Sequence, residues 1–442
     1  DYGTIALLTV FIAISQVFVQ SGLNTALIQA KEILEDDYSS VFWVSFGISC
    51  VLYLVLFFFE PIIAAYYCRP ELKSVLRVLA IILLPGAFNS IQNAKIAREL
   101  LFKYLMYSTF SATLLSGIVG IITAYLGYGI WALVFQQLSN QILVCLFMGI
   151  FIRWVPRWIF HFDRIRVLFS FGWKLMVSAL LDVGYTQLRS LIIGKRYSSE
   201  SLGFYNRGMQ FPQLIVDNLN GSIQSVMLPV LSRSQDDKTR MKEMMRRSIV
   251  TSSYVIFPLM VGLGVVAEPL VSILLTDKWL PCVPYLRIFC FIFAFYPVHT
   301  ANLQALNAQG RSDCFLRLEI LKKVVGVAAL VIVILKFDTA MSIAWSGVII
   351  ALISCFINAH PNKRLLGYSY FEQLRDIFPS AAISAVMGVV VYLLKYLPFS
   401  NGIILFVQIL VGIICYLLLS EITHLECYLY LKKMFLQFLK NR

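Results

Sequence analysis

Long runs of apolar residues alternate with short polar segments along all 442 residues of the chain. A bilayer core is about 30 Å thick, so a spanning helix needs roughly 20 apolar residues. The runs meet this length and leave no room for a large soluble domain. The pattern predicts an all-α polytopic membrane protein with thirteen visible spans, at residues 5–28, 41–66, 75–91, 105–125, 130–152, 173–193, 205–228, 249–275, 283–306, 315–335, 341–357, 377–394 and 403–419.

Composition supports a membrane protein. Apolar residues make up 59% of the chain and charged residues only 14%, which is too little charge to cover a soluble chain of this length. The nine cysteines are scattered, mostly inside the spans, with no Cys-x-x-Cys motif. We therefore interpret them as small packing residues, and expect neither a metal site nor a disulfide framework.

The distribution of basic residues predicts the orientation. When loops are assigned to alternating sides, 26 of the 37 Lys and Arg residues fall on one side and 10 on the other, with Arg189 inside a span. Cytoplasmic loops are enriched in Lys and Arg, so the first side, with the C-terminus, is predicted to be cytoplasmic. The net charge of +13 then reflects topology and lipid contact. Nucleic-acid binding is disfavoured because the basic residues are dispersed over many short loops.

An internal repeat organises the chain. Four features recur in the same order at a spacing of about 200 to 212 residues: Asp1-Tyr2-Gly3 and Leu202-Gly203-Phe204-Tyr205, Glu60-Pro61 and Glu268-Pro269, Leu76-Arg77 and Leu286-Arg287, and Gln92 and Gln304. Each copy holds six spans, an even number, so the two lobes have parallel topology about an axis along the membrane normal.

The repeat also predicts the domain boundaries. The second copy starts with the span 173–193, which has no counterpart before Gly3, so we expect fourteen helices in the intact protein. The expected parts are an N-terminal lobe lacking its first helix (1–152), a basic cytoplasmic linker (153–172), a C-terminal lobe (173–359), and a terminal helix pair with a basic tail (360–442).

Polar residues inside two adjacent spans carry the functional signal, because ionisable groups at membrane depth are costly and usually face a cavity or a partner. In span 173–193, Ser178, Asp182, Tyr185, Thr186 and Arg189 share one helix face. Asp182 and Arg189 lie two turns apart, about 10 Å along the axis, so each is expected to meet another group.

Span 205–228 carries a continuous polar stripe. Its members recur at helical spacing, and they are Asn206, Gln210, Gln213, Asp217, Asn220 and Gln224. Six residues in register, one of them acidic, favour a helix that lines a water-filled cavity between the lobes. Interhelical hydrogen bonding in a packed bundle and a surface amphipathic helix stay open as alternatives.

Catalytic signatures are missing from the sequence. It contains no Gly-x-Gly-x-x-Gly, no Walker loop and no His-Glu-x-x-His, so we expect no cofactor and no enzymatic activity. Energy for transport would then come from an ion gradient or the membrane potential.

The segment 171–237 carries a resemblance to a known family. It shows a Gly-Trp helix start, an Ile-Gly-Lys turn, a Leu-Gly-x-Tyr start and a Pro-Val-Leu-Ser close, at residues 172–173, 193–195, 202–205 and 229–232. With the opening segment 1–29, it resembles the polysaccharide exporter branch of the multidrug/oligosaccharidyl-lipid/polysaccharide (MOP) flippases, the Wzx-type and teichuronic-acid-exporter-like proteins.

The resemblance implies a flippase for undecaprenyl-diphosphate-linked oligosaccharide in the bacterial inner (cytoplasmic) membrane, with glycosyltransferases, a polysaccharide polymerase and membrane lipids as expected partners. Arg189, Lys174 and Arg98 are then candidates for the diphosphate, because charge-assisted contacts suit phosphate oxygens. The amides of the stripe would meet sugar hydroxyls, and Asp182 and Asp217 are candidates for a coupling ion or for counter-ions of Arg189. Alternatives are an ion-coupled drug or metabolite exporter of the same superfamily and a membrane glycosyltransferase, polymerase or ligase.

Overall fold

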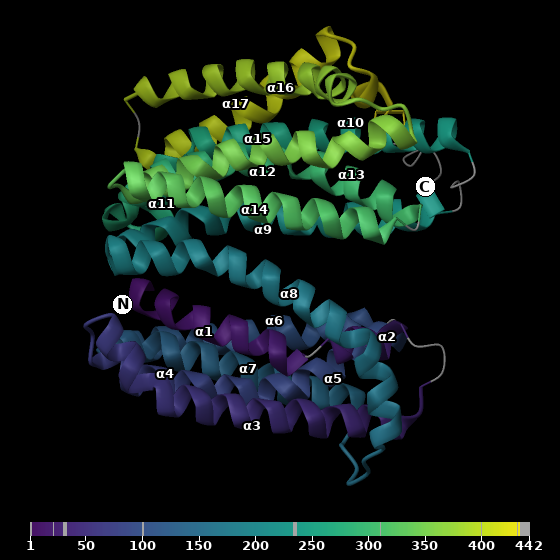
Figure 1. Ribbon diagram of the computed structural model, residues 1–442. Coiled ribbons are helices and arrows are strands. Elements are labelled where there is room, and N and C mark those ends of the chain that lie inside the picture. The colour runs from purple at the N-terminus through teal and green to yellow at the C-terminus, as the bar shows by residue number, and fades with distance from the viewer. Residues whose placement is uncertain are drawn as a thin grey trace. The chain divides into compact units, whose positions relative to one another are not determined.

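The computed structural model describes residues 2–20, 22–29, 33–99, 101–232, 237–309, 311–398, 400–430 and 432–433. Every regular element within these ranges is a helix, as the apolar runs predict (Figure 1). The chain divides into two compact units, Asp1–Gly203 and Phe204–Arg442.

The first unit is built from eight α-helices and one short 3₁₀ helix in the described part of the chain. These are α1 (Tyr2–Gln20), α2 (Leu23–Gln29), α3 (Glu35–Tyr66), α4 (Glu71–Leu79), η1 (Ala80–Ile82), α5 (Leu83–Glu99), α6 (Phe102–Tyr125), α7 (Ile130–Ile152) and α8 (Phe162–Arg196). The repeat assigns α8 to the second lobe by sequence equivalence, whereas its contacts group it with α1 and α2.

The second unit begins within the first turns of α9. Its elements are α9 (Ser199–Ser232), α10 (Lys238–Val265), α11 (Ala267–Leu275), η2 (Asp277–Cys282), α12 (Val283–Ala294), α13 (Tyr296–Ala308), α14 (Ser312–Lys336), α15 (Ala340–Leu365), α16 (Tyr370–Leu393), η3 (Leu394–Tyr396) and α17 (Asn401–Ile422).

Ten helical segments among the described residues are long and apolar enough to cross a membrane, and each matches one of the predicted spans. The other three predicted spans lie in α8, α9 and α14. These are helices of 35, 34 and 25 residues, but no 18-residue stretch of their described residues is both apolar enough and low enough in charge to count. The all-α polytopic fold is thus confirmed, and the total of thirteen stays a prediction at these three helices.

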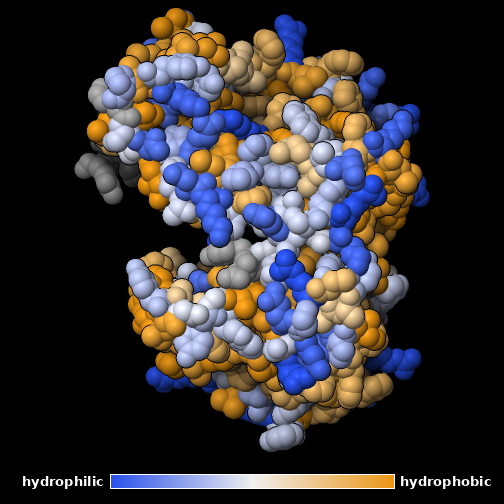
Figure 2. All heavy atoms as spheres, turned by 90° about the vertical axis from the view of Figure 1, so that its left-hand side faces the viewer, coloured by the Kyte–Doolittle hydropathy of each residue, from blue (hydrophilic) through white to orange (hydrophobic). Residues whose placement is uncertain are grey.

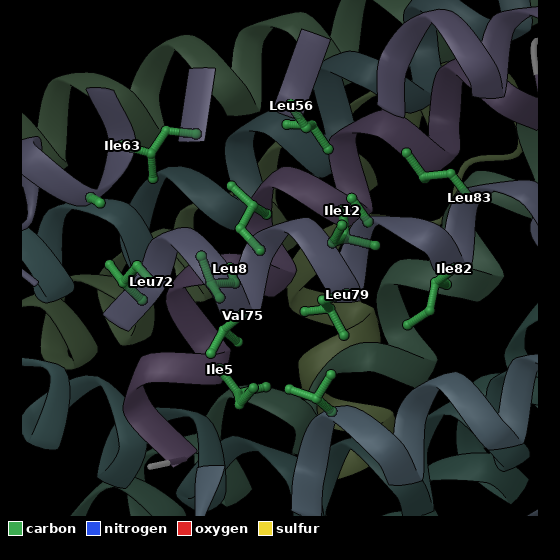
Figure 3. Close-up of a cluster of buried hydrophobic side chains, with 14 of the residues drawn as sticks. Ile5, Leu8, Ile12, Leu56, Ile63, Leu72, Val75, Leu79, Ile82 and Leu83 are labelled. Atoms are coloured by element: carbon green, nitrogen blue, oxygen red, sulfur yellow. The ribbon is translucent and has the colours of Figure 1, made fainter. Parts of the chain in front are cut away.

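The core of the first unit lies where α1 meets α3, α4 and α5. Ile5, Leu8 and Ile12 of α1 point into a cluster that Leu56 and Ile63 of α3 also enter (Figure 3). The other labelled side chains come from α4, η1 and the start of α5, and they are Leu72, Val75, Leu79, Ile82 and Leu83. Burying these apolar side chains fixes the ends of α4 and α5 against the long helix α3.

Glycines let α8 approach α1 closely along its length. Gly22, which directly precedes α2 and has a positive φ of 64°, lies so near Gly172 that a Cβ on it would sit 2.0 Å from the Gly172 carbonyl oxygen. Toward the other end of α8, a Cβ on Gly194 would lie 2.2 Å from Leu7 Cδ2 of α1. The contacts pair the start of α1 with the end of α8, so the two helices run antiparallel.

The segment between α7 and α8 packs on α3. Ser39 and Ser40 of α3 accept hydrogen bonds from the backbone N–H groups of Arg157 and His161, both at 3.1 Å. Arg164 Nε donates to Asp37 Oδ1 at 2.9 Å. The indole of Trp43 donates to the Arg157 carbonyl at 2.8 Å. Residues 153–161, predicted as a linker, are therefore held against the first unit.

The terminal helices α16 and α17 belong to the second unit. The Tyr416 hydroxyl donates to the Tyr254 carbonyl of α10 at 2.7 Å, and the Tyr254 hydroxyl donates to Ser420 Oγ at 3.1 Å. A Cβ on Gly388 of α16 would lie 2.6 Å from Val261 of α10. These contacts tie the terminal pair to α10.

The surface outside these contacts suits lipid. On α6, Phe110 is 68% exposed and Ile121 is 59% exposed, and on α17 Phe406 is 66% exposed. In water such side chains would be a liability, whereas hydrocarbon covers them without cost. Figure 2 views the helix ends on the side where α1 begins, and hydrophilic residues gather on that face while hydrophobic residues predominate along its rim.

Candidate functional site

One predicted polar face lies on α8, in the first unit. Arg189 is half-buried, and its Nη2 donates to the hydroxyl of Tyr185 one turn earlier at 3.4 Å. The guanidinium carbon lies 5.7 Å from the centre of the same ring. Thr186 is exposed beside them. Tyr185 thus positions the guanidinium on the predicted face of the helix, at a depth where the flanking turns are apolar.

Among the other candidate residues of the first unit, the structure describes the side chain of Arg98. The side chains of Lys174, Ser178 and Asp182 lie outside the residues that the structure describes. Arg98, predicted at the cytoplasmic entrance, donates through Nη1 to the carbonyls of Leu27 and Ile28 at 3.0 and 3.3 Å. These carbonyls belong to the last turn of α2, where a cation stabilises the helix end. Arg98 therefore has a structural role, and a role toward a diphosphate stays a prediction.

The second polar face is the stripe on α9, in the second unit. Gln210, Gln213 and Asp217 are exposed, Asn206 is half-buried, and Asn220 is 8% exposed. Leu214 and Asn218 are exposed on the same face. The side chain of Gln224 lies outside the described residues.

The stripe therefore has two parts. Gln210 Oε1 accepts a hydrogen bond from Arg207 Nη1 at 2.6 Å, one turn away along the same helix. The middle of the stripe presents amide and carboxylate groups outward, whereas the side chain of Asn220 is buried. Such a face can donate to and accept from a polar solute, and it differs from the lipid-facing surfaces of α6 and α17.

A buried amide network that the sequence did not predict joins α13, α15 and α16. Asn302 Nδ2 donates to Gln373 Oε1 at 2.7 Å, and Asn362 Nδ2 donates to Asn302 Oδ1 at 2.8 Å. All three side chains are at most 1% exposed. Such interhelical hydrogen bonds stabilise a bundle in lipid, so this network is structural. The signal that the sequence offered is that Asn358 and Asn362 lie one helical turn apart, so both share one face of α15.

His299 lies one turn before Asn302. Its Nδ1 is 3.1 Å from Asn358 Nδ2, and its Nε2 is 3.6 Å from Cys355 Sγ. The partners of both ring nitrogens are neutral side chains, which indicates a structural role for His299.

Metal ligands are not gathered in the described part of the chain, where no group of three His, Cys, Asp or Glu residues could hold an ion. The two polar faces offer hydrogen-bonding groups, the positive charge of Arg189 and the negative charge of Asp217.

A comparison with family models shows to which family the chain belongs. A model described as "Polysaccharide biosynthesis protein" matches residues 1–284, well over half of the chain. The chain belongs to the polysaccharide biosynthesis protein family. The match includes residues 1–29 and 171–237, whose motifs resemble those of polysaccharide exporters, and it confirms that resemblance.

Relatives within and near this family match most of the chain. The teichuronic acid biosynthesis protein TuaB of Bacillus subtilis is 24% identical over 422 residues, which are 92% of this chain and 85% of that protein. The lipopolysaccharide biosynthesis protein WzxC of Escherichia coli K12 is 21% identical, over 88% of this chain and 81% of that protein.

Solved structures confirm the fold. The lipid II flippase MurJ in an inward closed conformation superposes with a TM-score of 0.78 at 16% identity, covering 96% of this chain and 93% of MurJ. An inward-facing multidrug resistance MATE transporter of the MOP superfamily gives 0.64 at 14% identity, covering 82% of this chain and 90% of that one. At these identities the likeness shows the fold of a polytopic transporter.

Proposed function

We propose that this member of the polysaccharide biosynthesis protein family is a flippase. It moves undecaprenyl-diphosphate-linked oligosaccharide across the bacterial inner membrane for surface polysaccharide assembly. It acts as a transporter and not as an enzyme, with its C-terminus in the cytoplasm. Its working partners are the glycosyltransferases that complete the oligosaccharide and the polymerase that consumes it.

The observation that carries this proposal is the family match together with the named relatives. TuaB and WzxC are named for teichuronic acid and lipopolysaccharide biosynthesis, two polymers of the cell surface. A third relative, ExoT of Rhizobium meliloti, is named a succinoglycan biosynthesis transport protein. Three different polysaccharides share one kind of membrane chain, so the common step is movement of a glycan precursor.

The substrate's chemistry fits the polar helices. An undecaprenyl-diphosphate-linked oligosaccharide combines a polyprenyl chain that stays in lipid with a diphosphate and sugars that need hydration. Arg189 on α8, with Tyr185 beside it, supplies a fixed guanidinium for phosphate oxygens. We assign the diphosphate to Arg189, and assign Lys174 and Arg98 to attracting it at the cytoplasmic entrance.

The stripe on α9 suits the sugars. Gln210 and Gln213 are exposed amides that both donate and accept, as sugar hydroxyls require, and we add Asn206, Asn220 and Gln224 to this set. Asp217, exposed on the same face, and Asp182 on α8 are our candidates for a coupling ion. Mixed donors and acceptors bind varied sugars without demanding one stereochemistry.

The test is deletion of the gene followed by analysis of lipid-linked glycans in the two leaflets. A flippase predicts that the complete oligosaccharide accumulates on the cytoplasmic leaflet, and that the intact gene restores its export. Accumulation of an incomplete glycan would instead assign the protein to the glycosyltransferases. Normal export together with increased drug sensitivity would assign it to the drug exporters that share the fold.

A further inference from the structure

A basic cavity of about 570 Å³ lies in the second unit, and no residue of α9 lines it. One wall is the start of α10, which contributes Arg240, Glu243 and Arg247. The other wall is the helical segment 426–430 that follows α17, which contributes Glu426 and Tyr430. The Lys and Arg distribution predicts that this end faces the cytoplasm.

The wall formed by α10 changes from charged to apolar along its axis. Arg240, Glu243, Arg247 and Val250 recur at spacings of three and four residues, so they share one helix face. Arg240 and Arg247 are two turns apart, about 10 Å along the axis. Beyond Val250 the same helix enters the apolar cluster around Tyr254. The cavity therefore has charged residues at the end predicted to face the cytoplasm, and Val250, beside the apolar cluster, at the other end.

Arg246, which also lines the cavity, belongs to a polar cluster with Asp376 and Tyr368. Arg246 Nε is 3.0 Å from Asp376 Oδ1 of α16. The Tyr368 hydroxyl donates to Asp376 Oδ2 at 2.7 Å. Burial, and then this hydrogen bond to a carboxylate, raise the pKa of Tyr368, so its hydroxyl stays protonated and the cluster keeps its shape.

The contacts of Arg240 and Arg247 differ from those of Arg246. The guanidinium of Arg247 lies over the ring of Tyr430, 4.9 Å from its centre. Among the residues that the structure describes, neither arginine has a carboxylate within ion-pair distance, in contrast to Arg246. Glu243 and Glu426 are exposed on the same cavity. The cavity thus presents arginines for an anion and two carboxylates for a cation.

We propose that this cavity binds the headgroup of a phospholipid that carries both a phosphate and a primary ammonium. Arg240 and Arg247 bind the phosphate, because guanidinium groups match phosphate oxygens. Glu243 and Glu426 bind the ammonium, and the acyl chains follow α10 past Val250. This site stands independently of the proposed function, since none of its residues belongs to the predicted transport path.

The chemistry discriminates among lipids. A phosphatidylglycerol headgroup has the phosphate but leaves the two carboxylates without a partner. Phosphatidylcholine has a cation, but its trimethylammonium has no N–H to donate. Phosphatidylethanolamine supplies both a phosphate and three N–H donors. We therefore expect the order of affinity to be phosphatidylethanolamine first, with the other two weaker.

The experiment uses the purified full chain in a mild detergent, titrated separately with phosphatidylethanolamine, phosphatidylglycerol and phosphatidylcholine, with retained lipid counted by native mass spectrometry. The wild-type protein is expected to retain one phosphatidylethanolamine at the lowest lipid concentration. The double variant Arg240→Gln/Arg247→Gln is expected to lower this retention about tenfold or more, as loss of a charge-assisted contact implies. Arg364→Gln, an exposed cation outside the cavity, is the matched control and leaves it unchanged.

Four results would overturn the proposal. The first is that the wild-type protein retains phosphatidylglycerol as well as phosphatidylethanolamine. The second is that the Glu243→Gln/Glu426→Gln variant keeps the wild-type preference for phosphatidylethanolamine. The third is displacement of the lipid by inorganic phosphate at the concentration of the lipid itself, which would assign the site to free phosphate.

The fourth result comes from a variant that keeps every charge, which is needed if the charge variants do not fold. Val250→Trp fills the cavity, so undiminished phosphatidylethanolamine retention by this variant would contradict the site.

Discussion

The guanidinium of Arg287 lies 3.0 Å from the carboxylate of Glu268 in the second unit, and Arg77 binds Glu60 in the same way in the first unit. The sequence repeat matches each glutamate and each arginine separately, as parts of two dipeptides spaced alike in the two copies. The structure shows that the two matches are one interaction. It joins α3 to α4 in the first unit and α11 to α12 in the second, so it occurs once in each copy of the repeat.

The two ion pairs differ in their surroundings. Glu60 is 2% exposed, and its cation is Arg77, whose guanidinium also lies 4.5 Å from the centre of the Phe57 ring. Glu268 is 35% exposed and binds a second cation, Lys395, at the end of the terminal helix α16. In the second unit Glu268 thus binds two cations, one of them from the segment that follows α16, whereas in the first unit Glu60 binds Arg77.

Arg77→Ala is therefore expected to destabilise the protein more than Arg287→Ala. Removing Arg77 leaves a buried carboxylate without its cation, which is strongly destabilising. Removing Arg287 leaves Glu268 with Lys395, and a half-exposed pair contributes about 1 kcal/mol or less. Thermal unfolding of the purified variants measures the difference, with Lys73→Ala, an exposed cation near Arg77 in sequence, as the control. Equal losses from both arginine variants would contradict this account.

The helices and the repeat could be predicted because they depend on local information. Apolar runs of about 20 residues have few structures open to them in a membrane, so α3, α6 and α17 follow from sequence. The polar face of α9 also follows, since helical spacing alone decides which side chains share a face.

Contacts between distant segments could not be predicted. Trp43 stacks on Trp158 with ring centres 4.2 Å apart, although 115 residues separate them, and this contact helps hold residues 153–161 against α3. Nothing local marks Gln373 as the partner of Asn302, because a single polar residue near a helix start has many uses. Such pairings depend on which helices pack together, and the packing is decided by the whole apolar core.

The approach of α1 to α8 predicts a severe effect of Gly22→Ala. Gly22 has a positive φ, and its added Cβ would lie 2.0 Å from the Gly172 carbonyl oxygen, so both the backbone and the contact are disturbed. We expect a large loss of monodisperse protein in size-exclusion chromatography. Gly47→Ala in α3, where a Cβ meets nothing within 4 Å, is the control and should be neutral or slightly stabilising. A well-behaved Gly22→Ala protein would show that the helices can separate freely.

The amide network predicts a measurable coupling between Asn302 and Gln373. Each single change to Leu leaves buried amide groups without partners, at a cost of about 1 to 3 kcal/mol. The double variant removes both amides together, so its loss should be smaller than the sum by about 1 kcal/mol. Unfolding free energies from denaturant titration of the four proteins give this coupling. Additive losses would mean that the two side chains act separately.

The stripe on α9 predicts loss of transport without loss of folding. Gln213→Leu replaces an exposed amide with an apolar group, so fewer hydrogen bonds are available to sugars, and glycan export in a complemented deletion strain should fall several-fold. Asp217→Asn tests the coupling ion and should change the dependence of export on the ion gradient. Gln137→Leu makes the same amide-to-apolar change in α7 and should leave export intact. If Gln213→Leu behaves like this control, the stripe does not meet the substrate.

Arg189 gives the most direct test of the transport path. A guanidinium that binds a diphosphate contributes about 1.5 to 3 kcal/mol through charge-assisted hydrogen bonds, so Arg189→Gln should lower export by about ten- to a hundredfold. Arg189→Lys keeps the charge but not the planar fork, and should retain part of the activity. Arg166→Gln removes an exposed arginine from the same helix and serves as the control for expression and charge. Full export by Arg189→Gln would exclude this side chain as the diphosphate ligand, whereas failure of Arg189→Lys and Arg189→Gln alike, with both proteins folded, would show that the shape of the guanidinium matters as much as its charge.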